Sequence, residues 1–202
     1  MRAVTLIAVV VVLVFCLPAA AVEDKPNILR LGVLFSEPTS KTVESGVRFK
    51  ADSSVGGQFN YEHRFAEHMG VFMSVERLAY DLKASVPGSS KIKIGSFDVY
   101  PVSFGYLYHF ILDKPLDFYA GGGAAWLPYS NLKVEPGFGE DLDINNGLAW
   151  VLDLGLEWKL GKPKRWGLGL DVRYVSIKPD VVRITEIGVK PVDAILGLSY
   201  HY

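Results

Sequence analysis

Apolar and polar residues alternate along most of this chain, and the segment Lys190–Tyr202 shows the pattern most clearly. Every second position from Val192 to Tyr202 is apolar or aromatic, whereas most of the positions between are small or polar. Because successive side chains of a β-strand point to opposite faces, this alternation predicts a strand with one apolar face. The predicted strand ends on the aromatic ring of Tyr202, which is typical of the closing strand of a transmembrane β-barrel.

Eight segments carry this alternation, and helical spacing fits none of them. In the clearest, seven apolar or aromatic residues from Leu148 to Leu160 share one face. The predicted strands are Ile28–Ser36, Val55–Phe65, Met69–Tyr80, Phe97–Phe110, Leu116–Leu127, Gly147–Leu160, Trp166–Lys178 and Lys190–Tyr202.

The connections between these strands alternate in length. The short ones are Ala66–His68, Ile111–Pro115 and Gly161–Arg165, and the long ones are Glu37–Ser54, Asp81–Ser96, Pro128–Asn146 and Pro179–Val189. Outer-membrane barrels have short periplasmic turns and longer outside loops. The sequence therefore predicts an all-β fold, an eight-stranded antiparallel up-and-down transmembrane β-barrel with both termini on the periplasmic side.

Alternation alone does not tell whether the apolar face points outward into lipid or inward into a core. The alternative is a secreted soluble barrel such as a lipocalin, apolar inside and polar outside. The polar set is rich in glycine, which suits the narrow interior of an eight-stranded barrel. Aromatic residues also gather near the strand ends of the apolar set, which favours the membrane barrel with an aromatic girdle. The girdle candidates are Tyr108, Phe110, Trp126, Trp158, Trp166 and Tyr200.

The N-terminus has the features of a secretory signal peptide. A charged start, an apolar run from Val4 to Leu17 and small residues up to Ala21 predict removal of residues 1–21, leaving residues 22–202 as the barrel domain. The single cysteine, Cys16, lies in the removed segment, and Phe15 before it disfavours the alternative of a lipoprotein. The mature chain then has no disulfide or thiol chemistry. The formal net charge of -1 predicts no nucleic-acid partner.

Several strands resemble those of the OmpW family of outer-membrane proteins. The run from Asn145 to Trp158 is similar to the sixth strand of that family, and Trp166–Tyr174 resembles the seventh, which ends in an Asp-x-Arg-Tyr-like segment. Tyr100–Phe110 and Phe118–Gly123 are similar to the fourth and fifth strands, and Arg30-Leu31-Gly32 matches the start of the first. Together these pieces cover most of the mature chain in the order of the family.

The resemblance implies a barrel with a narrow, partly hydrophobic interior that moves small hydrophobic molecules across the outer membrane. Members of the family also serve as receptors for bacteriocins. The chain departs from the family in the apolar and basic segment Lys178–Val189, and in ending on Tyr202 where the family usually has Phe. Since the terminus stays aromatic, we expect the barrel assembly machinery to recognise the face of Leu196, Leu198, Tyr200 and Tyr202.

Charged and polar residues of both signs occupy the face opposite the apolar one. Because an unpaired buried charge is unfavourable, we expect them to pair in a network that fills the narrow lumen. The alternative is a filter or gate along a conduit. The candidates are Arg30, Glu62, Arg64, Glu76, Asp153, Glu157, Asp171, Arg173 and Asp193, with Gln58, Asn60, His109, Lys159 and His201 beside them.

Apolar residues occupy the inward positions toward the long loops. They would make the outer mouth less polar than the periplasmic half, and we consider them candidates for a hydrophobic gate. The alternative is that they only pack the barrel. The residues are Leu34, Phe72, Leu78, Leu127, Val175 and Ile177.

Two other classes of function, a barrel enzyme and a non-transporting barrel, are alternatives to transport. Ser199 and His201 share the inner face of the last strand, as in lipid-modifying barrel enzymes, but a separation of about 7 Å along a strand exceeds hydrogen-bond reach, so we expect no catalysis. The four histidines lack ligand-type spacing, so we expect no metal or other cofactor. A non-transporting barrel could instead act through its exposed loops as a receptor, adhesin or anchor.

The expected partners are outer-membrane lipids, the barrel assembly machinery and small hydrophobic solutes; the sequence leaves the oligomeric state open.

Overall fold

The computed structural model describes residues 26–39, 42–44, 47–85, 90–110, 115–137, 139–161, 165–176 and 191–202, so the expected signal peptide lies outside the described residues. Within these ranges no helix is long and apolar enough to cross a membrane. The strands are β1 (Asn27–Pro38), β2 (Thr42–Glu44), β3 (Val47–Ala51), β4 (Ser54–Ala66), β5 (Met69–Ser85), β6 (Ile92–Val99), β7 (Val102–His109), β8 (Leu116–Leu127), β9 (Lys133–Val134), β10 (Gly147–Leu160), β11 (Trp166–Ser176) and β12 (Pro191–His201).

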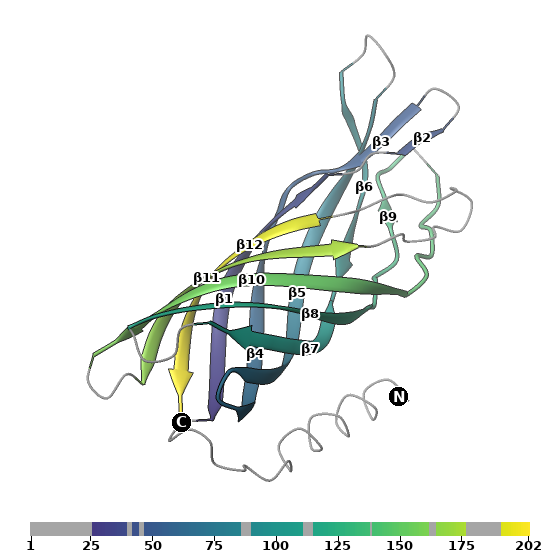
Figure 1. The fold of residues 1–202 in the computed structure, drawn as a ribbon. Coiled ribbons are helices and arrows are strands. Elements are labelled where there is room, and N and C mark those ends of the chain that lie inside the picture. Colours follow the sequence, from purple (N-terminus) through teal and green to yellow (C-terminus); the bar gives the residue numbers. More distant parts are fainter. Residues whose placement is uncertain are drawn as a thin grey trace.

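Eight strand positions form a closed antiparallel barrel (Figure 1). Going round the wall, β1 pairs with β4, then β5, β7, β8, β10, β11 and β12 follow. The ring closes because β12 pairs back onto β1, with Leu31 opposite Leu198. The predicted fold class is therefore confirmed.

The two ends of the barrel differ. The chain ends at Tyr202 beside Asn27, at the end of the barrel where β4 turns into β5 between Ala66 and Met69. We call this the turn end. The opposite end carries the long connections, and we call it the loop end.

The prediction of Phe97–Phe110 as one continuous strand is wrong. Pro101 has no N–H to donate to the ladder, and the strand divides there into β6 and β7. The carbonyl of Pro101 still accepts from Glu76 N, and Tyr100 N donates to the carbonyl of Pro128. Both halves therefore stay in the wall, with β5 pairing to β7 near the turn end and to β6 near the loop end.

Three of the predicted long loops contain strands. β2 and β3 lie within Glu37–Ser54, the end of β5 and the start of β6 within Asp81–Ser96, and β9 within Pro128–Asn146. Together they form a sheet that rises from one side of the barrel, which we call the loop-end extension (Figure 1). They form strands because inward side chains such as Leu82 and Leu132 pack on the same apolar cluster as Leu34 of the barrel. The fourth long loop, Pro179–Val189, lies outside the described residues.

The apolar face of the barrel wall points outward. On β10 the side chain of Trp150 is 75% exposed, whereas its neighbour Val151 is 1% exposed, and this alternation continues to Lys159. Such a continuous apolar surface is unfavourable in water and suits lipid. The lipocalin alternative, with its apolar face inside, is therefore excluded.

The outward face changes character along β5. Val75 is exposed and apolar, but the next outward residues toward the loop end include Arg77, Asp81 and Lys83, all on the protein surface. Arg77 lies 3.8 Å from Asp98, and Lys83 pairs with Asp52. Because exposed charges of this kind favour water, the apolar band ends between Val75 and Arg77 and the loop-end extension projects beyond it.

Candidate functional site

The interior divides along the barrel axis into two chemically different parts. Toward the turn end lies a set of buried charged side chains, which we call the ion network, and toward the loop end lies an apolar chamber. The ion network consists of Arg30, Glu62, Arg64, Glu76, His109, Asp117, Asp153, Glu157, Lys159, Arg173 and His201. The apolar chamber consists of Leu34, Leu78, Leu82, Phe97, Val99, Leu127, Val175 and Ile195.

Arg64 is the centre of the ion network nearest the turn end. Its Nη2 donates to Asp117 Oδ2 at 2.8 Å and lies 2.9 Å from His109 Nδ1, and its Nε donates to Glu62 Oε1 at 3.3 Å. His109 Nε2 in turn lies 2.7 Å from Glu62 Oε1. All four side chains are at most 2% exposed, so they form a dry cluster from β4, β7 and β8.

Arg30 links this cluster to the opposite side of the wall. Its guanidinium lies 2.7 Å from Glu62 Oε2 and 3.2 Å from Glu157 Oε2. It also lies over the ring of Tyr119, with 5.1 Å to the ring centroid. A single cation therefore connects carboxylates of β4 and β10 across the lumen.

Ser199 and His201 both contact Glu157. Ser199 Oγ donates to Glu157 Oε1 at 2.9 Å, and His201 Nε2 contacts the same oxygen. The serine proton is thus directed to a carboxylate rather than to the imidazole. This arrangement differs from that of an activated serine, in which the base accepts the hydroxyl proton.

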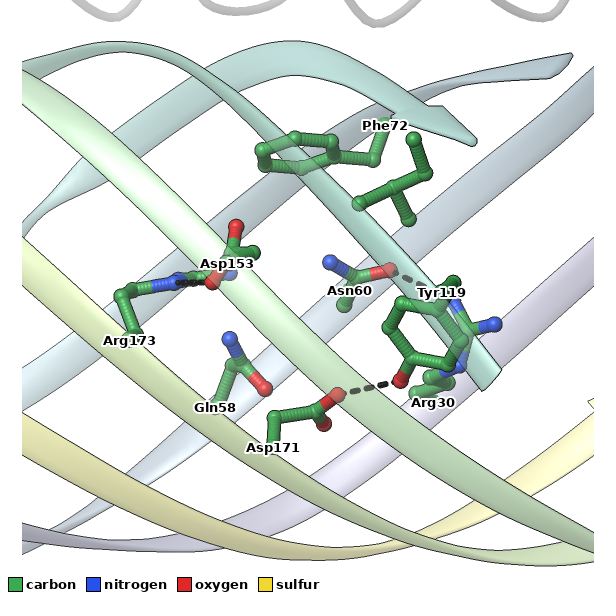
Figure 2. A pocket seen from close by; sticks show the side chains of 9 residues that line it. Arg30, Gln58, Asn60, Phe72, Tyr119, Asp153, Asp171 and Arg173 are labelled. Atoms are coloured by element: carbon green, nitrogen blue, oxygen red, sulfur yellow. Dashed lines mark hydrogen bonds and ion pairs between the residues drawn. The ribbon is translucent and has the colours of Figure 1, made fainter. Parts of the chain in front are cut away.

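Tyr119 and Asp171 form a hydrogen bond in the middle of the barrel (Figure 2). Gly155 on β10 provides the space for it, because a Cβ there would collide with both the Tyr119 ring and the Asp171 carboxylate. Asn60 accepts a hydrogen bond of 3.4 Å from Arg30 at the same level. Asp171 therefore binds to Tyr119 rather than to an arginine.

Arg173 is the centre of the ion network nearest the apolar chamber. Its Nε donates to Asp153 Oδ1 at 2.6 Å, as Figure 2 shows, and its Nη1 donates to Ser74 Oγ at 3.0 Å and to Glu76. Gln58 adds a hydrogen bond of 3.0 Å to Glu76 Oε1. One guanidinium thus holds two carboxylates from strands on different sides of the barrel.

The space between these clusters is small. A cavity lined by Arg30, Phe72, Tyr119 and Arg173, among others, holds about one water molecule (Figure 2). Side chains therefore fill the lumen at this level, in accord with the size of an eight-stranded barrel. In the described ranges, no three His, Cys, Asp or Glu side chains form a group suited to a metal ion.

The predicted gate residues do not all lie in the same part of the interior. Leu34, Leu78, Leu127 and Val175 are buried in the apolar chamber, at the loop end where the sequence placed them. Phe72 is placed wrongly by the sequence, since it packs with Leu107 and Tyr119 beside the ion network instead of at the mouth. Its position follows from the register, which sets Phe72 opposite Glu62 near the turn end. The sixth residue, Ile177, lies outside the described residues.

Asp193 is buried but stands apart from the ion network. Both of its carboxylate oxygens lack a hydrogen-bond partner within the described residues. It lines a cavity at the base of the apolar chamber together with Leu78, Val99 and Tyr129. Tyr129 follows β8 beyond the strand end; its hydroxyl is likewise unpartnered, and burial raises the pKa of its phenol.

The outward aromatic residues gather mainly near the turn end. Phe110 packs on Tyr108 and Phe118, and Trp166 packs on Tyr200, while Trp158 is exposed close by on β10. Trp126 lies at the loop end of β8, opposite Leu148. Of the terminal face, Leu196, Leu198 and Tyr202 point outward and are exposed.

Sequence reasoning missed two residues of the site. Asp117 contacts Arg64, His109 and Lys159, and Tyr119 contacts Arg30 and Asp171. Asp117 lies between the outward residues Leu116 and Phe118, and Tyr119 follows Phe118. The period of two therefore already assigned both residues to the inner face.

Comparisons with known proteins place the chain among outer-membrane barrels. The family model described as outer membrane protein beta-barrel domain matches residues 7–201. No curated protein matches the chain. The solved structure of the outer membrane protein OprG from Pseudomonas aeruginosa is 14% identical, with a TM-score of 0.77 over 87% of this chain and 95% of that one.

Two further structures share the fold. The outer membrane protein AlkL, determined in lipid bilayers, is 21% identical with a TM-score of 0.62, covering 92% of this chain and 94% of that one. Ail, the attachment invasion locus protein of Yersinia pestis, is 15% identical with a TM-score of 0.53, covering 89% and 100%. With the match over nearly the whole chain and the lipid-facing wall, the protein belongs to the outer membrane protein beta-barrel domain family of the bacterial outer membrane.

Proposed function

We propose that this protein is an OmpW-like barrel that facilitates the passage of small hydrophobic molecules across the outer membrane. The observation that carries the proposal is the apolar chamber, which lines the loop end of the interior with apolar side chains while the part toward the turn end is charged. The Leu82 and Leu132 side chains belong to the same apolar cluster and continue it beyond the lipid band. The resemblance to the OmpW family implies the same activity.

The loop end is the outside in this proposal, and the termini are periplasmic. The exposed ion pairs of the loop-end extension suit an aqueous surface, and short turns face the periplasm in bacterial barrels. The outward face of Leu196 and Leu198 on β12, with Tyr202 just beyond its end, would then be presented to the barrel assembly machinery before closure onto β1.

The ion network acts in this proposal as a plug and not as a catalytic centre. Each arginine described above contacts carboxylates, and Ser199 donates to Glu157. An ion or polar solute would have to break these buried pairs to pass, which is strongly unfavourable. The barrel should therefore be a poor ion channel.

The experiment is solute entry into proteoliposomes whose outer leaflet contains lipopolysaccharide, which slows the direct permeation of apolar solutes. The folded state is verified by a band shift on unheated gels. We expect n-octane to enter faster than in protein-free vesicles and chloride to enter no faster. Leu127→Asp, which places a charge in the apolar chamber, should abolish the gain, whereas Ala79→Asp on the exposed outer surface of β5 should keep it.

A folded barrel that gives no gain for octane would contradict transport. Attention would then move to a second candidate, a receptor or adhesin that acts through its loops. The loop-end extension favours this candidate, because its paired strands present the exposed pair of Lys93 and Asp81 at 2.9 Å beyond the lipid band. Transfer of the residues between β5 and β6 and between β8 and β10 to another small barrel would test it.

A further inference from the structure

The apolar chamber contains one polar group that the proposed transport of hydrophobic molecules does not use. The Asp193 carboxylate is 0% exposed, and neither oxygen has a hydrogen-bond partner in the described part of the chain. It faces a cavity whose other walls are mainly apolar and include Leu78, Val99, Leu127 and Val175. A buried carboxylate is unfavourable unless its oxygens accept hydrogen bonds, so a further donor at this site would be favourable.

Two polar neighbours flank Asp193 on the adjacent strands. Ser36 is its register partner on β1, and the Ser36 and Tyr80 hydroxyls share a hydrogen bond of 2.6 Å in which either oxygen can donate. When Tyr80 donates, the Ser36 hydroxyl can turn its proton toward Asp193. Arg173 is the register partner on β11, but that guanidinium bonds to Asp153, Ser74 and Glu76. These two neighbours therefore offer the carboxylate at most one neutral donor.

The charge balance of the interior points to a cation. Among the described residues, four arginine and lysine side chains and the imidazoles of His109 and His201 face seven carboxylates inside the barrel. They are Arg30, Arg64, Lys159 and Arg173 against Glu62, Glu76, Asp117, Asp153, Glu157, Asp171 and Asp193. Even with both imidazoles protonated, the cations are one fewer than the carboxylates. Asp193 is the carboxylate left without a hydrogen bond.

We propose that the cavity at Asp193 binds small apolar molecules that carry a protonated primary amine. The ammonium group donates to the Asp193 carboxylate, and the hydrocarbon part lies against Leu78, Val99, Leu127 and Val175. This inference rests on the proposed function, since it assigns a class of solute to the apolar chamber. An ammonium–carboxylate hydrogen bond is stronger than one between neutral groups, so it favours amines over alcohols of equal length.

The cavity holds about one water molecule in this structure, which matches the volume of an ammonium head group and not that of a whole solute. The hydrocarbon part must therefore displace side chains of the chamber or extend toward the loop end. The unpartnered hydroxyl of Tyr129 lies in the same wall and can accept a second N–H from the head group.

Calorimetric titration of the folded barrel in zwitterionic lipid nanodiscs tests the proposal. The probes are n-hexylamine as its hydrochloride, n-hexanol and sodium hexanoate, with the heat of empty nanodiscs subtracted. We expect hexylamine to bind most tightly and hexanoate most weakly. Asp193→Asn should weaken hexylamine binding about ten- to a hundredfold and leave hexanol unchanged. Asp171→Asn is the matched control, a partly buried interior carboxylate already bonded to Tyr119, and should keep hexylamine binding.

Two results would overturn the proposal. The first is equal affinity for hexylamine in the wild type and in Asp193→Asn. The second is wild-type protein that binds hexanoate as tightly as hexylamine, a result that does not depend on the folding of any variant. The two proposals fail separately. Loss of octane flux with hexylamine binding intact leaves a binding site without transport, whereas octane flux with no preference for hexylamine leaves a conduit without amine recognition.

Discussion

Arg173 and Asp193 are register partners on β11 and β12, yet the Arg173 guanidinium is hydrogen-bonded to Asp153 on its other side, with its Nη2 3.2 Å from Asp153 Oδ2. Two aspartates thus flank one arginine on neighbouring strands, and their environments differ. Asp153 is paired, and Asp193 faces the apolar chamber. This difference predicts that the same substitution destabilises the barrel at one position and not at the other.

Asp153→Asn should destabilise the barrel, because it removes a partner from a buried guanidinium. The expected loss is about 3–5 kcal/mol of the free energy of unfolding. Asp193→Asn should cause no loss, because it removes a buried charge whose oxygens accept no hydrogen bond in the described part of the chain. Urea unfolding in phospholipid vesicles, followed by the gel band shift, measures both. A loss at Asp193 as large as that at Asp153 would show that Asp193 is part of the ion network.

Glu62→Gln should strongly destabilise the turn end of the interior. Glu62 contacts Arg30, Arg64 and His109, and its loss leaves these three side chains without a shared buried carboxylate. We expect a loss of about 3–5 kcal/mol. The matched control is Glu37→Gln, since Glu37 pairs with Lys50 at 3.3 Å on the surface, where a pair contributes about 0–1 kcal/mol. Equal effects in urea unfolding would contradict a dry ion network.

Gly155→Ala should disturb the hydrogen bond between Tyr119 and Asp171. The added methyl group would collide with both side chains, and such overpacking costs about 1–3 kcal/mol. Gly169→Ala on β11 is the control, because the nearest atoms to a Cβ there lie 4.0 Å away. Thermal unfolding of the two variants should separate them. A Gly155→Ala barrel as stable as the Gly169→Ala barrel would mean that Tyr119 has room to move.

Leu154→Arg tests the position of the lipid band. Leu154 is outward near the middle of β10 and 54% exposed, so an arginine there would enter the hydrocarbon region. The expected cost is about 2–4 kcal/mol in lipid, compared with about 0–1 kcal/mol for Ala79→Arg beyond Arg77 on β5. Unfolding in vesicles checks both values. A smaller cost at Leu154 than at Ala79 would place the membrane elsewhere on the wall.

Tyr202 offers a way to separate barrel closure from recognition during assembly. Its backbone N donates to the carbonyl of Asn27 at 2.9 Å, and Asn27 N donates back at 3.2 Å. Deletion of Tyr202 removes this pair and should reduce both the stability of the refolded barrel and its insertion in cells. Tyr202→Ala keeps the backbone pair, so it should refold normally in vitro but insert poorly in cells. Normal insertion of Tyr202→Ala would exclude the ring as an assembly signal.

The period of two in the sequence by itself determined the wall of this protein. It placed Trp150 outward and Val151 inward, and it predicted β10 with its observed bounds, because a strand's side-chain direction depends only on local geometry. It also assigned Arg30 and Glu157 to the interior. Local alternation could not show that Pro101 divides the fourth strand or that β9 lies within a predicted loop, since both depend on pairing with distant strands.

Only the tertiary structure decided which interior charges meet. Barrel closure brings Arg30 of β1 within reach of Glu157 of β10, residues far apart in the chain, and the tilt and register of the strands set Phe72 beside the ion network and not at the mouth. The same register leaves Asp193 facing apolar side chains, and the residues next to it in the sequence do not predict this environment. Pairing depends on stagger around the closed ring, and the alternation of one strand carries no information about the stagger of the next.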